Sequence, residues 1–325
     1  MTKRELDIEI IKPPLRIKFK KFCKSIFKKY RKVYISYENN NPIINVHLLM
    51  NILVSKLKPP VNKDYIRNRK YTELDFINGI IDVINNCAYW NRYKGLISGK
   101  YLNKRHNQYN KWGVYECLYR IVLLSYYSSN KFNKLKNQAI DSTFIKNLYG
   151  EDIYGRNVKY KSKNGVSVSV IVDLNGVPIS LAIASANKND SMIAIEQLNH
   201  FIIEPDTNKV KNNNKFRQNM FADAIYYTTD IYDLLKKKGY TPITDTNKRN
   251  TKDPKLLKEI EKHKNKYIKK GVKRLIVERF NAWIHFYPKM DRVIEKSIGS
   301  FKGLLLLSCA LTVSKKYTNL IKKTK

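Results

Sequence analysis

Cysteine is scarce in this sequence of 325 residues. The four cysteines lie far apart, and no Cys-x-x-Cys pair is present: they are Cys23, Cys87, Cys117 and Cys309. Neither a disulfide scaffold nor a zinc finger is therefore expected. A chain of this kind is typical of a reducing compartment.

Several common motifs are also missing. The sequence contains no GxxxxGK[ST], no GxGxxG and no HExxH, so ATP-dependent, NAD-dependent and zinc-protease functions have no motif to support them. The first 21 residues lack the continuous apolar core of a signal peptide. The longest apolar run, Gly303–Val313, is shorter than the ~20 residues that a membrane span needs. We expect a buried helix there, in an intracellular protein that is not secreted.

Acidic residues are few relative to basic ones. Lys and Arg total 63 and Asp and Glu total 27, which leaves a net charge of +36. Basic side chains in such excess repel one another unless an anionic partner neutralises them. Nucleic acid, an anionic membrane and an acidic protein are the candidates. A membrane surface is the least favoured, because the lysines are not clustered beside an amphipathic anchor. Codon usage in an A/T-rich genome is an alternative source of part of the excess.

The chain divides by pattern into three parts. Residues 1–60 are basic and only weakly periodic, with a short apolar helix expected at Ile43–Val54. Residues 61–136 are predicted to be helical, because apolar residues recur there at helical spacing. Residues 137–325 alternate strands and helices, and a basic helical insert is expected at 246–271. The predicted N-terminal region is therefore all-α, and its helical part at 61–136 is a candidate for binding nucleic acid.

The clearest strand pattern is VSVSVIVDLNGVPISLAIAS, residues 166–185. Valine alternates with serine, and Asp173-Leu174-Asn175-Gly176 supplies a turn, so a hairpin is predicted. Further strands are expected around residues 137–145, 215–224 and 240–245, and helices around 192–203, 229–238 and 273–287. Hairpins followed by strand–helix alternation indicate a mixed five-stranded α/β sheet flanked by helices.

Three acids interrupt apolar or amphipathic segments of this region. Asp141 lies in AIDSTF, Asp223 in MFADA and Glu278 in LIVERFNAW. An acid is costly to bury unless it meets a cation or a metal, and carboxylate oxygens are the ligands that Mg²⁺ and Mn²⁺ prefer. Taken singly, each acid could instead cap a turn or helix, or pair with a neighbour such as Arg274. Their occurrence together on this element order favours a metal site.

These segments resemble DDE transposases of the insertion-sequence type, in the superfamily that groups insertion-sequence families four and five. The matching stretches are AIDSTFIK, ASANKNDS at 184–191, MFADAIYYTTDIYDLLKKKGYTPI, RLIVERFNAWIHFY and FKGLLLLSCAL. The resemblance implies an RNase H-like catalytic domain over residues 137–325. It also implies that Asp141, Asp223 and Glu278 are the catalytic, metal-binding triad for two Mg²⁺ or Mn²⁺ ions, with no nucleotide cofactor.

The sequence departs from the family pattern at several positions. The family signature around the glutamate is Tyr-x2-Arg-x3-Glu-x6-Lys. Arg274 occupies the Arg position, whereas Gly271 replaces the Tyr and His285 replaces the Lys. Ile225 stands where a Gly usually follows the second Asp. These differences weaken the expected contacts to DNA ends but leave the three acids in place.

Five residues around the last acid are candidates for contacting DNA: Arg274, Arg279, Trp283, His285 and Arg292. Arginine and protonated histidine suit phosphates, and an aromatic ring can stack on an unpaired base. Each also has an ordinary interpretation. The charged residues could be exposed helix positions, and Trp283 could continue the apolar stripe of Ile276 and Phe280.

The resemblance implies cleavage at transposon ends followed by strand transfer into target DNA. The partners would be double-stranded terminal repeats and target DNA, held by a homodimer and located wherever the DNA is. Two alternatives stay open at this stage. One is a catalytically inactive, transposase-derived DNA-binding protein, which the changes at Gly271 and His285 motivate. The other is an RNase H-like nuclease.

Overall fold

The computed structural model describes residues 8–10, 17–38, 41–59, 70–128, 135–152, 155–158, 161–199, 207–226, 228–244, 253–268 and 275–322. The chain forms two compact units. We call the first the sheet unit, which comprises residues 1–13, 129–146 and 153–283. We call the second the helical unit, which comprises residues 14–128, 147–152 and 284–325. Neither unit is one continuous stretch of chain.

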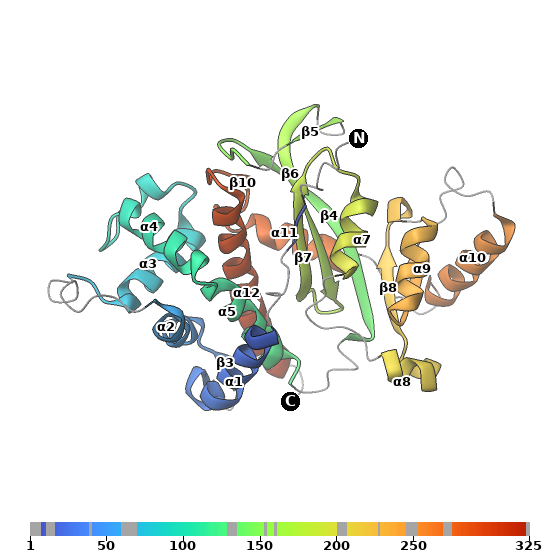
Figure 1. Cartoon of the computed structure of the whole chain (residues 1–325), viewed down its shortest axis with the longest axis horizontal. Coiled ribbons are helices and arrows are strands. Elements are labelled where there is room, and N and C mark those ends of the chain that lie inside the picture. Colours follow the sequence, from blue (N-terminus) through green and yellow to red (C-terminus); the bar gives the residue numbers. More distant parts are fainter. Residues whose placement is uncertain are drawn as a thin grey trace. The chain divides into compact units, whose positions relative to one another are not determined.

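The sheet unit is built on strands in the order β1-β7-β6-β4-β8-β9, of which Figure 1 labels β7, β6, β4 and β8. The strands are β1 (Ile8–Ile10), β4 (Asn137–Asn147), β5 (Gly155–Asn157), β6 (Lys163–Asp173), β7 (Pro178–Ser185), β8 (Gln218–Ala222) and β9 (Tyr240–Thr244). Pairing is antiparallel from β1 to β4 and parallel from β4 to β9. The mixed sheet of RNase H-like type is thereby confirmed, and β1 and β5 extend the five predicted strands.

The hairpin of β6 and β7 is present with its predicted turn. The Asp173 carboxylate accepts hydrogen bonds from the amides of Asn175 at 2.8 Å and Val177 at 2.9 Å. Gly176 has a φ of +72°, a conformation that glycine adopts without a steric cost. The alternation of Val and Ser suggests a strand with one exposed face, but the structure buries both faces. The Ser169 hydroxyl is buried against α7, where it donates to Gln197 Oε1 at 2.6 Å.

Among the described residues, the helices that belong wholly or mainly to the sheet unit are α7 (Asp190–Asn199), α8 (Thr207–Asn212), α9 (Thr229–Lys237), α10 (Pro254–Ile268) and α11 (Leu275–His285). Helix α7 packs on β6 and β7 (Figure 1). The expected insert at 246–271 contains α10, which begins where the Asp253 carboxylate accepts from the Lys255 amide at 2.9 Å. Ile260 of α10 packs against Tyr232 of α9, so this basic helix is anchored on the sheet unit.

The helical unit contains α1 (Ile17–Tyr34), α2 (Val46–Leu57), α3 (Glu73–Asn86), α4 (Gly99–Lys111), α5 (Val114–Tyr126) and α12 (Ile298–Lys322). A small hairpin, β2 (Ile35–Glu38) with β3 (Asn41–Ile44), and the short β10 (Arg292–Val293) accompany them. The N-terminal region is therefore helical, with one hairpin that the sequence pattern does not reveal. The division at residues 60 and 136 also differs from the observed units, because α12 packs against α5, α4, α2 and β3.

Helix α12 forms the centre of the helical unit. Between Ile298 and Tyr317 it is long and apolar enough to cross a membrane by length and composition. Most of this segment is buried inside the protein, and the predicted buried helix at Gly303–Val313 is confirmed. Cys23 and Cys117, which are distant in sequence, also meet in this unit with their sulfur atoms 3.6 Å apart. Both thiols are free.

A buried polar network surrounds Glu295, which is 5% exposed. Its Oε1 accepts from Lys289 Nζ at 2.9 Å and from Trp90 Nε1 at 2.9 Å, and its Oε2 accepts from Ser300 Oγ at 3.0 Å. Ser300 Oγ lies 3.0 Å from His106 Nε2. Since Trp90 and Glu295 are 205 positions apart in sequence, this network joins the early helices of the unit to its C-terminal segment.

We expect Glu295→Gln to destabilise the helical unit strongly. The substitution leaves the Lys289 ammonium buried without its counter-charge, which costs about 3–5 kcal/mol. Urea unfolding followed by circular dichroism measures the loss. The matched control is Glu151→Gln, whose partner Lys296 lies 3.3 Å away with both side chains mostly exposed. An exposed ion pair contributes little to stability. Equal losses in the two variants would therefore contradict a stabilising role for the buried Glu295–Lys289 pair.

The stability of the helical unit should also decrease as the pH is lowered, because of His106. Burial lowers the pKa of His106 to about 4, whereas an unfolded histidine titrates near ~6.5. Below that value the unfolded chain binds a proton that the folded chain does not bind. We therefore expect a loss of about 2 kcal/mol between pH 7 and pH 5, read from unfolding curves at each pH. A His106→Gln variant should show a flatter dependence, and an unchanged slope would argue against this residue.

Candidate active site

Asp141 and Asp223 lie on neighbouring parallel strands. In the pairing of β4 with β8, Ala139 stands opposite Phe221, and the ladder ends there. Each acid lies two residues beyond its strand's member of that pair. Asp141 is still in β4, whereas Asp223 directly follows the end of β8 at Ala222. Two of the three predicted acids thus lie at equivalent places just beyond the same strand pairing.

Each of these carboxylates is oriented by the next residue of the chain. Asp141 Oδ1 accepts from the Ser142 amide at 2.9 Å, and Asp223 Oδ1 accepts from the Ala224 amide at 2.6 Å. Both acids are half-buried. Each carboxylate is therefore held by a hydrogen bond from the backbone amide of the following residue, and not by a long, flexible side chain of another residue.

A buried tyrosine lies among these acids. Tyr226 ends the short turn η5 (Ala224–Tyr226) and is 1% exposed, and its hydroxyl is 3.0 Å from Ser142 Oγ. Burial raises the pKa of Tyr226 well above its usual value of 10, and the negative charges of Asp190, Asp141 and Asp223 raise it further. The phenol therefore stays protonated with three carboxylates around it.

Asp190, the first residue of α7, is one of these carboxylates. The cap of α7 is supplied by Asn189, whose side-chain oxygen accepts from the Ser191 amide at 3.1 Å. Capping by Asn189 therefore accounts for the helix start without Asp190. The charge of Asp190 acts on the Tyr226 phenol more strongly than that of Asp141 does. Asp190 is thus a member of the acidic surroundings of Tyr226.

Glu278, the third predicted acid, lies in the first turn of α11 and is exposed. In the described part of the chain, no group of three or more His, Cys, Asp and Glu side chains is placed so that it could hold a metal ion. The charges of Asp141 and Asp223 both act on Tyr226, whereas Glu278 is not part of any three-ligand group among the described residues. The role of Glu278 stays a prediction.

The chemistry of the pair fits a divalent cation. Mg²⁺ is usually held by one or two carboxylates together with waters and substrate phosphates, not by a cage made wholly of protein ligands. Asp141 and Asp223 supply two such carboxylates, both near enough to Tyr226 for their charges to act on its phenol. Their shared negative charge also favours a cation between them.

The candidate DNA contacts lie in different surroundings. Arg279 is exposed on α11. In the helical unit, Asp291 is shared by two candidates, since its Oδ1 lies 3.6 Å from His285 Nδ1 and its Oδ2 lies 3.1 Å from Arg292 Nε. Any phosphate at these two side chains would have to compete with this carboxylate. Arg274, like Gly271, lies outside the described residues.

Trp283 packs against the hairpin turn of the sheet unit. A Cβ atom added to Gly176 would lie 3.1 Å from the indole Cζ3 of Trp283. The ring is half-buried. This position favours packing over base stacking, and it shows why a glycine suits residue 176 on two grounds, the positive φ and the close approach of the indole.

Two residues near these acids, Ser142 and Tyr226, are not among those that the sequence singled out, whereas Asp190 lies in the stretch ASANKNDS that resembles the family. Both adjoin segments that do stand out, since Ser142 follows Asp141 and Tyr226 follows Asp223 by three positions. Tyrosine is so abundant in this chain, with 23 copies, that a single buried one carries no signal. Only the fold shows which tyrosine meets the acids.

Residues 134–313, more than half of the chain, match the family described as "Transposase DDE domain". The chain therefore belongs to the DDE transposase family and is a DNA transposase. No curated protein matches it.

Solved structures of Mos1 mariner transposase are also similar to this chain. Its catalytic domain is 11% identical, with 68% of this chain and 98% of that chain covered and a TM-score of 0.24. A pre-cleavage Mos1 transpososome is 10% identical, with 92% and 87% covered and a TM-score of 0.26. A Mos1 paired-end complex with Mn is 11% identical, with 92% and 88% covered and a TM-score of 0.22. At these TM-scores the assignment depends on the family match alone.

Trp283→Ala should reduce stability if the indole packs as described. Removing a large, partly buried aromatic ring costs about 2–3 kcal/mol, somewhat less than full burial would imply. Thermal unfolding gives the loss, and duplex DNA affinity is measured in parallel below the unfolding temperature. The matched control is Phe286→Ala just beyond α11, because Phe286 is 78% exposed. A variant with normal stability and weaker DNA binding would instead support base stacking.

Proposed function

We propose that this transposase cleaves phosphodiester bonds at transposon ends and transfers the released strand into target DNA, with Mg²⁺ or Mn²⁺ as cofactor. The observation that supports the proposal is the register of β4 with β8, whose last pair, Ala139 and Phe221, lies two residues before each of the aspartates. In this proposal Asp141 and Asp223 hold the metal ions, and Glu278 completes the site when DNA is bound. A bound divalent cation supplies Lewis acidity to the attacking water or 3′-hydroxyl and to the leaving oxygen.

The amide of Ser142 holds one oxygen of the Asp141 carboxylate, and the amide of Ala224 holds one oxygen of the Asp223 carboxylate. Their contribution is preorganisation, because side chains already held in place need not be ordered during the reaction. No nucleotide cofactor is needed, since transesterification conserves the phosphodiester bond.

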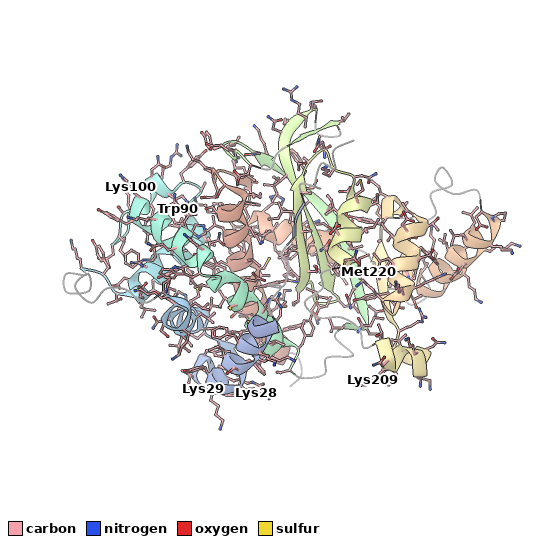
Figure 2. All side chains as sticks on the ribbon, viewed as in Figure 1. Lys28, Lys29, Trp90, Lys100, Lys209 and Met220 are labelled. Carbon is pink, nitrogen blue, oxygen red and sulfur yellow. The ribbon has the colours of Figure 1, made fainter. Side chains whose placement is uncertain are left out.

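Helix α1 is a suitable surface for the DNA partner. Its apolar side carries Cys23 and Ile26, both buried. Its opposite side is exposed and basic, and the exposed basic residues are Lys21, Lys24, Lys28, Lys29, Arg31 and Lys32. Figure 2 labels Lys28 and Lys29 on this helix. We propose that this row holds the phosphate backbone, with an affinity that falls steeply as salt rises. A homodimer on two transposon ends is part of the same proposal.

Carboxylate-to-amide variants test the assignment of the acids. Asp141→Asn, Asp223→Asn and Glu278→Gln should each lower Mg²⁺-dependent cleavage of terminal-repeat DNA by at least about a hundredfold, because each removes a metal-binding charge. DNA binding without metal should persist. The matched control is Asp230→Asn, an exposed acid in the first turn of α9, which should cleave normally.

The outcomes separate the competing functions. Cleavage by Asp141→Asn would rule out this site. Loss of cleavage in the two aspartate variants but not in Glu278→Gln would remove Glu278 from it. Tight binding by the wild type with no cleavage in Mg²⁺ or Mn²⁺ would favour the inactive DNA-binding alternative. Joined products containing target DNA would exclude a simple RNase H-like nuclease.

A further inference from the structure

The backbone pairing that aligns the two aspartates stops before it reaches them. The ladder between β4 and β8 ends at Ala139 and Phe221, and β8 itself ends at Ala222. Asp141 and Asp223 therefore lie where main-chain hydrogen bonds of this ladder no longer hold the two strands together. Something else must set the separation of the carboxylates if they are to share a cation.

Beyond the end of the ladder, a side-chain hydrogen bond connects the segment after β8 with β4. Tyr226 follows Asp223 in a tight turn, in which the Tyr226 amide donates to the Asp223 carbonyl at 3.0 Å. The Tyr226 hydroxyl then reaches back to Ser142 Oγ on β4 at 3.0 Å. Ser142 in turn orients Asp141 through its amide at 2.9 Å. One continuous chain of contacts thus runs from Asp223 through Tyr226 and Ser142 to Asp141.

The buried surroundings of the Tyr226 hydroxyl stabilise its hydrogen bond with Ser142. Tyr226 is 1% exposed, so water competes little for its hydroxyl. A buried hydroxyl that lost its partner would carry a desolvation penalty, so Tyr226 and Ser142 hold each other in place.

We propose that Tyr226 is a positioning residue that acts through Ser142 to set the separation of Asp141 and Asp223 for a divalent cation. The proposal rests on the proposed function, since it assumes that this pair of carboxylates binds the metal. Tyr226 itself is not assigned a contact with the metal or with DNA.

The chain offers a matched control for this role. Tyr240 is also fully buried in the sheet unit, and its hydroxyl donates to Gln138 Oε1 of β4 at 3.3 Å. Gln138 lies three residues before Asp141 and within the β4–β8 ladder. Tyr240→Phe therefore removes a comparable buried hydrogen bond to the same strand, at a place where the main chain already fixes the pairing.

The experiment measures Mn²⁺ affinity of the full chain by the electron paramagnetic resonance signal of the free ion. Tyr226→Phe should weaken Mn²⁺ binding about three- to tenfold, the size expected for one lost buried hydrogen bond. Tyr240→Phe should stay within about twofold of the wild type. Ser142→Ala should resemble Tyr226→Phe, and the double variant should be no weaker than the weaker single variant, because both remove the same bond.

Thermal unfolding of each variant separates positioning from general packing. Both tyrosine variants should lose some stability, but only Tyr226→Phe should lose Mn²⁺ affinity. Wild-type affinity in Tyr226→Phe, an equal loss in Tyr240→Phe, or additive losses in the double variant would each overturn the positioning role. The variants Asp141→Asn and Asp223→Asn distinguish failure of the positioning role of Tyr226 from failure of the proposed metal site. If they bind Mn²⁺ normally the proposed function fails, whereas if they lose binding and Tyr226→Phe does not, only the present inference fails.

Discussion

The parallel pairing of β4 with β8 is the constraint on which the active site depends. It sets Ala139 opposite Phe221 and so carries the two acids, 82 residues apart in the sequence, to equivalent positions. A shift of the register by one residue would turn one of the two carboxylates to the other face of the sheet. The rest of the sheet unit protects this register, since β6 pairs with β4 from the other side over most of its length and β9 pairs with β8.

Much of the sheet could be predicted because its signals are local. The turn at Asp173–Gly176 and the alternating valines before it specify a hairpin, and the cap at Asp253 with Pro254 specifies where α10 begins. The pairing of β4 with β8 has no such signal, because no short turn connects parallel strands. Asp141 and Asp223 could therefore be connected beforehand through their places in the predicted order of elements and through the resemblance to a family, but not through a local signal. The position of Tyr226 depends on that pairing and could not be predicted either.

The helical unit shows a second limit of local reasoning. The apolar run at Gly303–Val313 indicates a buried helix, but nothing in that run says that α12 packs against α5 and β3. Glu295 is a similar case. As one acid in a lysine-rich segment it has no visible importance, yet it binds Lys289 and Trp90 in the interior. Long-range contacts of this kind explain why the observed units do not follow the linear boundaries expected at residues 60 and 136.

The large positive charge and the few acids have separate physical roles. Glu295 and Glu73 are largely buried with basic partners, Lys289 at 2.9 Å and Lys58 at 2.8 Å, so each stabilises the helical unit by pairing. Around Tyr226 the arrangement is different, because Asp141, Asp190 and Asp223 all act on one neutral phenol. Carboxylates held near one another repel unless a cation joins them. Asp141 and Asp223 therefore belong to the proposed cation site, whereas Glu295 and Glu73 belong to the structural ion pairs of the helical unit.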